Sequence, residues 1–201
     1  MSRNECNYLA PGARLVTAVS SALIVVSICA CRGEPPPSLP PTVAALVEQQ
    51  KWEDAIPILK KHLLVCPEDV AAHYYLGACY LNLRDPILAI AEGEFQVALT
   101  LFRRNGMASP IDGVSPRDFE LRCHLGLANV YIRSLAVVTT LTSDMSIISP
   151  LVHNLGMAVA NAASIAPDDP RVERLQTLVD KLMRQPGAPP PAEESQARVS
   201  A

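Results

Sequence analysis

Cysteine and histidine are the residue types in this chain with the most direct routes to catalysis, redox chemistry or metal binding. The chain has 201 residues, six of them cysteine and four histidine. None of the histidines has the spacing of a zinc pair such as H-x₃-H. Cys123-His124 ends like a haem-attachment motif but lacks its earlier cysteine. The sequence therefore predicts no metal site and no haem; the four histidines are His62, His73, His124 and His153.

The sequence also lacks the motifs that build nucleophiles or phosphate sites. It contains no G-x-G-x-x-G, no phosphate loop and no G-x-S-x-G elbow. Asp168-Asp169 is a carboxylate pair, but its place before Pro170 is typical of a turn that caps a helix. The loop at 105–114, with Asp112-Gly113, is either functional or a plain insertion. We predict that the protein is not an enzyme and uses no cofactor.

Composition and charge favour a helical protein that does not bind nucleic acid. Hydrophobic residues make up 49% of the chain and aromatic residues only 4%. Alanine and leucine dominate, which favours helix. The net charge is −3, and the basic residues gather only at Lys60-Lys61-His62 and Arg103-Arg104. Nucleic-acid binding needs a clustered cationic face, so the sequence predicts no such partner.

The first 31 residues are typical of a bacterial export signal with a lipid-attachment cysteine. Arg3 and Arg14 precede residues 15–30, which are mostly apolar and carry no charge. This run is shorter than the roughly 20 apolar residues of a membrane-spanning helix. Residues 28–31, Ile-Cys-Ala-Cys, resemble the lipobox of bacterial lipoproteins. The resemblance implies cleavage after residue 30 and a diacylglycerol on Cys31; an ordinary cleaved signal and an uncleaved anchor are the alternatives.

The residues that follow predict how the anchored protein is organised. Residues 31–41 are rich in proline and favour an extended spacer. Residues 42–184 are expected to form the folded domain, and residues 185–201 a disordered tail. Loss of residues 1–30 removes two arginines and one glutamate, so the charge of −3 becomes −4. Arg32 follows the cysteine instead of Asp, and by the same resemblance this implies the outer membrane, facing the periplasm.

Apolar residues recur at helical spacing along the whole domain. The pattern predicts helices that begin at Thr42, at Trp52 and after the capping pair Glu68-Asp69. Further helices are expected at 87–102, from Ser115 to about 141, and at 170–183. Residues 142–149 are expected to be a loop, with Ser149 capping a helix at 151–165.

These helices resemble tetratricopeptide (TPR) repeats, in which L-G-x₂-Y is followed by A-x₃-F and P. Residues 76–80, Leu-Gly-Ala-Cys-Tyr, match the first part, with His73 as a core side chain where Trp is usual, and Ala91 and Phe95 match the second. Ala55, Leu59 and Pro67 keep the spacing of an earlier unit, and Leu125-Gly126 begins a third, stretched one. The resemblance implies an all-α array of about three helical hairpins with a C-terminal capping helix. A generic helical bundle is the alternative.

In TPR arrays the first helix of each unit lines a groove that holds a partner segment. Carried over to this chain, the resemblance implies an apolar or amphipathic protein segment as the ligand. The alternative is that the inserted residues 135–165 or the capping helix fill the groove. The groove face implied by the resemblance comprises Tyr74, Ala78, Leu81, Asn82, Glu120, Cys123, Leu127 and Tyr131.

Two functional hypotheses follow. In the first, a lipid-anchored TPR-type scaffold recruits a protein partner in the bacterial cell envelope. In the second, a small-molecule-binding or redox-responsive envelope protein uses Cys79 and Cys123, which lie on equivalent helices of neighbouring units. Small buried thiols are the simpler interpretation of both cysteines.

Overall fold

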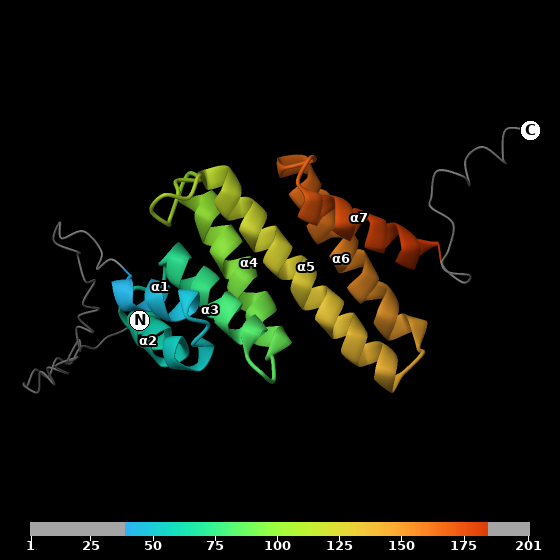
Figure 1. Cartoon of the computed structure of the whole chain (residues 1–201), viewed down its shortest axis with the longest axis horizontal. Helices are drawn as coiled ribbons and strands as arrows, with labels where there is room; N and C mark the ends of the chain where they lie inside the picture. Colours follow the sequence, from blue (N-terminus) through green and yellow to red (C-terminus); the bar gives the residue numbers. More distant parts are fainter. Residues whose placement is uncertain (1–38, 185–201) are drawn as a thin grey trace, which may run out of the picture. The chain divides into compact units, whose positions relative to one another are not determined.

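The computed structural model describes residues 39–184 and shows seven α-helices and no strand in that part of the chain (Figure 1). The predicted all-α helical-hairpin array is therefore confirmed. The predicted signal peptide, Cys31, nearly all of the spacer and the tail lie outside the described residues. The helices are α1 (Pro41–Glu48), α2 (Trp52–Val65), α3 (Val70–Asn82), α4 (Leu88–Arg104), α5 (Pro116–Leu141), α6 (Met145–Ile165) and α7 (Pro170–Met183).

Helices that follow one another in the sequence pack side by side. α1 packs on α2, α3 on α4 and α5 on α6, and each pair also contacts the next through α2 with α3 and α4 with α5. α7 packs on α6 at the C-terminal end of the array (Figure 1). Most connections are short, so successive helices run in opposite directions, and their apolar faces form a shared core.

Short polar side chains fix where several helices begin. The Asp69 carboxylate accepts a hydrogen bond from the Ala72 backbone N–H at 3.0 Å and caps α3. The Ser115 hydroxyl accepts one from Asp118 N–H at 3.0 Å and caps α5, as predicted. Each cap satisfies a backbone donor that has no partner inside the helix.

The start of α6 differs from the prediction. The helix begins at Met145, so only residues 142–144 separate it from α5, and Asp144 rather than Ser149 is its N-cap. The predicted loop at 142–149 and the predicted cap at Ser149 are therefore wrong. Pro150 lies inside the helix and removes one backbone hydrogen bond. The helix continues through it because partly buried Ile148, Leu151 and Val152 pack on the core on both sides of the proline.

Phe95 joins three helices at the centre of the array. Its side chain is only 2% exposed. A Cβ atom at Gly77 on α3 would lie 3.2 Å from the Cγ and Cδ1 atoms at the base of the ring, and one at Gly126 on α5 would lie 2.7 Å from the Cζ atom at its tip. The two glycines therefore let α3 and α5 approach one ring on α4. Gly77 thus packs on the partner helix of its own hairpin, whereas Gly126 packs on the preceding hairpin, so the two Leu-Gly motifs are not structurally equivalent.

Helix α5 is longer than its neighbour α4. It has 26 residues and α4 has 17, and the contacts of Arg103 with Glu120 and of Glu92 with Tyr131 leave residues 136–141 beyond the start of α4, roughly 9 Å at 1.5 Å per residue. Figure 1 shows the α5–α6 connection beyond the end of α4. Within residues 39–184, no helix combines the length and apolar character needed to cross a bilayer.

Candidate functional site

The eight residues of the predicted groove do not form one open surface. Leu81, Cys123, Leu127 and Tyr131 are buried in the core, so the prediction is corrected at these four positions. Tyr74, Ala78 and Glu120 are half-buried, and Asn82 alone is exposed.

The α5 half of the predicted groove faces α4 instead of solvent. The Tyr131 hydroxyl donates a hydrogen bond to Glu92 Oε1 on α4 at 2.8 Å. Burial and this bond raise the pKa of Tyr131 to about 12. Arg103 on α4 donates to Glu120 Oε1 at 3.0 Å. This side of α5 is therefore an interface within the protein and has no room for a partner segment.

The α3 half of the predicted groove contains an aromatic cluster around Tyr74. Its ring centroid lies 5.4 Å from that of Tyr75, 5.4 Å from that of Phe119 and 5.9 Å from that of Phe95, with the rings steeply inclined. Edge-to-face contacts of this kind stabilise aromatic pairs and fix their orientation. Burial raises the pKa of Tyr74, and the nearby Arg122 guanidinium partly opposes that rise. Tyr74 is thus a rigid, half-buried residue beside a cation.

The exposed side of α5 carries polar residues that the sequence analysis missed. Arg122, Asn129 and Arg133 recur seven and four residues apart, which places them on one side of the helix, and all three are exposed. Arg133 donates a hydrogen bond to the backbone carbonyl of Leu81 on α3, and the charge of Arg122 acts on Tyr75. These residues therefore adjoin the open side of α3.

We refer to this combined surface as the α3–α5 face. It consists of Tyr74, Tyr75, Ala78 and Asn82 on α3 and Arg122, Asn129 and Arg133 on α5. The polar spacing of Arg122, Asn129 and Arg133 was visible in the sequence. The match of Leu125-Gly126 to Leu76-Gly77 instead predicted that α5 exposes the same side as α3, and that side does not include these three residues.

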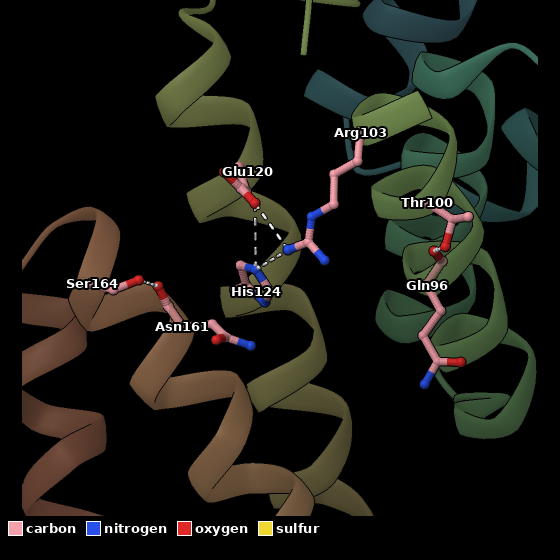
Figure 2. Close-up of polar contacts among 7 residues, drawn as sticks. All are labelled: Gln96, Thr100, Arg103, Glu120, His124, Asn161 and Ser164. Carbon is pink, nitrogen blue, oxygen red and sulfur yellow. Dashed lines mark hydrogen bonds and ion pairs between the residues drawn. The ribbon is translucent and has the colours of Figure 1, made fainter. Parts of the chain in front are cut away.

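A second polar group joins α4 and α5 (Figure 2). Arg103 Nη2 lies 3.0 Å from Glu120 Oε1 and 3.5 Å from His124 Nε2. His124 Nε2 in turn lies 4.0 Å from Glu120 Oε1. His124 is buried, and its Nδ1 atom has no hydrogen-bond partner. Burial lowers the pKa of His124, Glu120 opposes that shift and Arg103 adds to it. Because a guanidinium only donates, His124 is neutral, with its proton on Nδ1.

The other side chains in Figure 2 do not complete a catalytic group around His124. The Thr100 hydroxyl donates to the Gln96 carbonyl at 2.8 Å, and the Ser164 hydroxyl donates to the Asn161 carbonyl at 2.7 Å. Both hydroxyls are thus engaged with their own helices. Within residues 39–184 no hydrogen bond joins His124 to a hydroxyl, and the contact of Arg103 with Glu120 and His124 positions α5 against α4.

His73 lies on α3 in a very different environment. Its Nδ1 is 2.6 Å from Glu94 Oε2 on α4, and its Nε2 is 2.9 Å from the Pro67 carbonyl oxygen. Burial lowers the pKa of His73, but the bonds to Glu94 and Pro67 outweigh it and the net pKa is raised. Both partners only accept hydrogen bonds, so the ring carries two protons and a positive charge. The prediction of a plain core side chain is replaced by a half-buried ion pair.

The three cysteines in the described part of the chain are free thiols, and two of them are fully buried. Burial raises the pKa of Cys79 to about 12 and raises that of Cys123 as well. Since the thiolate is the reactive form of cysteine, this environment disfavours redox chemistry at both positions.

Residues 39–184 contain no group of three or more His, Cys, Asp or Glu side chains placed to hold a metal ion. Comparison with protein-family models, curated proteins and solved structures gives no match to this chain. The geometry of the α3–α5 face is therefore the principal guide to function.

Proposed function

We propose that this protein is a lipid-anchored adaptor of the bacterial cell envelope and that its α3–α5 face binds a segment of a protein partner. The observation that carries the proposal is the pairing of aromatic and cationic side chains on two packed helices. Tyr74 and Tyr75 on α3 lie within the electrostatic reach of Arg122 on α5. Tyrosine and arginine are the residue types that dominate binding energy at protein interfaces.

The face also indicates the chemistry of the partner. Arg122 and Arg133 are exposed cations, and Ala78 leaves an apolar surface between the tyrosines and Asn82. A guanidinium binds carboxylates with two parallel hydrogen bonds, and tyrosine rings pack against apolar side chains. The proposed ligand is therefore an amphipathic segment with acidic residues, a more specific partner than the apolar or amphipathic segment implied by the repeat resemblance.

The membrane attachment in this proposal is supported by the sequence of residues 1–31. The charge-free run at 15–30 ends at a lipobox-like Cys31, and two or more acyl chains give stable anchoring where one chain does not. Attachment at the outer membrane would present the α3–α5 face to the periplasm.

Affinity capture of the full chain from detergent-solubilised membranes tests the partner. We expect a reproducible partner with the wild-type protein and its loss with Tyr75→Ala plus Arg122→Glu. Because a single interface residue of these types contributes about 2 kcal/mol, the dissociation constant of the double variant should rise by at least about 30-fold. The control is Gln96→Ala plus Arg174→Glu, which changes exposed residues on α4 and α7. Equal capture by the two double variants would contradict the proposed face.

Intact mass of the membrane-extracted protein tests the anchor. The expected mass corresponds to a chain that begins at Cys31 and carries acyl groups, and Cys31→Ser should abolish the modification. An unmodified chain that begins at Met1 would refute it.

A further inference from the structure

The tip of the α5–α6 hairpin is the largest concentration of exposed apolar side chains at one connection of the described chain. Val137 is 53% exposed and Leu141 80% exposed at the end of α5. Met145 is 53% exposed and Ile147 49% exposed at the start of α6. Only residues 142–144 separate the two helices, so these four side chains project from one connection. We refer to residues 137–147 as the hairpin tip.

The tip is uncovered on one side because α5 continues past α4, the preceding helix that it packs on. The contacts of Arg103 with Glu120 and of Glu92 with Tyr131 place the start of α4 level with about residue 135, so residues 136–141 carry the end of α5 roughly 9 Å beyond it. The apolar side chains of the tip are therefore a protrusion, and a partner must accept them by deforming around them or by offering a matching hollow.

Charge is almost absent from this part of the molecule. Asp144 is the only Asp, Glu, Lys or Arg between Arg133 and Asp168. Exposed helices in water normally carry charged residues on their outer sides. The end of α5 after Arg133 and the whole of α6 lack such residues, so this part of the hairpin suits surroundings of low polarity.

Several polar groups of the tip are paired within the hairpin. The Thr139 hydroxyl donates to the Leu135 carbonyl at 2.7 Å, and the Thr140 hydroxyl donates to the Val137 carbonyl at 2.7 Å. In the connection, the Asp144 backbone N–H donates to the Thr142 hydroxyl at 3.0 Å.

The first turn of α6 continues this internal pairing. The Ser146 backbone N–H donates to the Asp144 carboxylate at 2.8 Å, and the Ile147 N–H donates to the Asp144 carbonyl at 3.1 Å. Polar groups without partners are costly to remove from water, whereas groups paired inside the tip enter a less polar medium at much lower cost.

From these observations we propose that the hairpin tip inserts its apolar side chains into the interfacial layer of a lipid bilayer. A fluid bilayer accepts a protrusion without a preformed hollow, and an apolar tip with a single charge needs no charged partner there. The charged Asp144 limits insertion to the depth of the lipid headgroups. The inference rests on the proposed membrane attachment and adds a second contact to it, which would fix how the domain is held at the membrane.

Tryptophan fluorescence of the full chain in phosphatidylcholine vesicles with brominated acyl chains tests the inference. The chain has one tryptophan, so Trp52→Phe removes the background. Met145→Trp then reports the tip, and Met157→Trp is the matched control on the same helix, because these methionines are 53% and 52% exposed. We expect bromine quenching and a blue shift for Met145→Trp and neither for Met157→Trp. Equal quenching of the two would overturn the inference.

A second pair of variants separates insertion from anchoring. Leu141→Asp should abolish the quenching of Met145→Trp, while Leu64→Asp, at an 86% exposed position at the end of α2, should leave it unchanged. Flotation of every variant with the vesicles is expected from the lipid anchor. Flotation without quenching would overturn the tip contact and keep the anchor, and failure of the wild-type chain to float would overturn both.

Discussion

Helices α3 and α5 carry the same Leu-Gly motif and use it in different ways. Gly77 on α3 packs at the base of the Phe95 ring, and Gly126 on α5 packs at its tip. The ring lies on α4, which is the hairpin partner of α3 and belongs to the hairpin that precedes α5. A glycine in such a motif therefore indicates a close approach to an aromatic ring. It does not by itself show which helix of a repeat it lies on.

The histidines of these two helices differ in the same way. His73 on α3 is held as a cation by two acceptors, whereas His124 on α5 is neutral and has a buried nitrogen without a partner. The first stabilises contact between α3 and α4 through its charge. His124 lies at the contact between α4 and α5, where an apolar side chain could replace the imidazole.

Loss of the shared ring is expected to have the largest effect. Phe95→Ala should lower the free energy of unfolding by about 3–5 kcal/mol, because it leaves a cavity between three helices. Urea unfolding followed by circular dichroism measures this. Val97→Ala, at an exposed position of α4, should change stability by less than about 0.5 kcal/mol. Similar losses in the two variants would show that Phe95 does not join the helices.

The two glycines should respond differently to an added methyl group. Gly126→Ala places Cβ 2.7 Å from Phe95, whose base is already held by Gly77, so we expect a net loss of about 1–3 kcal/mol. Gly77→Ala, at 3.2 Å, should cost less than Gly126→Ala.

Gly93→Ala is the control for the glycine pair, because its Cβ meets nothing within 4 Å and helix propensity should stabilise it by about 1 kcal/mol. A Phe95→Leu background should reduce the cost of Gly126→Ala. If it does not, the clash is not with the ring.

The ion pair on α3 predicts a stability that falls at high pH. The folded-state pKa of His73 is raised, so its contribution is fully present below the unfolded value of 6.5 and is lost as pH rises through the folded pKa. Glu94→Gln should cost about 1–2 kcal/mol at pH 6 and less at pH 9. Urea unfolding at both pH values measures this, and an equal cost at both would contradict a charged His73.

The smallest effect is expected at His124. Its folded-state pKa is lowered, so stability is fully present above 6.5 and declines as pH falls through that value toward the folded pKa. His124→Leu should change stability at pH 7.5 by less than about 1 kcal/mol, because it removes an unpaired buried donor. The variant should also lose the decline between pH 7.5 and pH 5. A large loss at pH 7.5 would show that the imidazole makes an essential bond.

Part of the site was predictable and part was not. Tyr74, Ala78 and Asn82 on α3 were predicted from the motif to face a partner, and the structure leaves the first two half-buried and the third exposed. The α5 residues were misassigned, because buried positions occupy most of the circumference of α5 and the motif alone did not fix its rotation. Arg122, Asn129 and Arg133 became recognisable once the contacts of α5 with α3 and α4 were known.

The sequence by itself determined the all-α class, the hairpin packing of successive helices and the cap at Ser115. These features depend on neighbours three or four residues apart, or on two helices joined by a short turn. Only the tertiary structure decided the rotation of α5, the early start of α6 and the exposure of the hairpin tip. Each of these depends on which distant helix covers which side, and that choice comes from packing among α3, α4, α5 and α6 together.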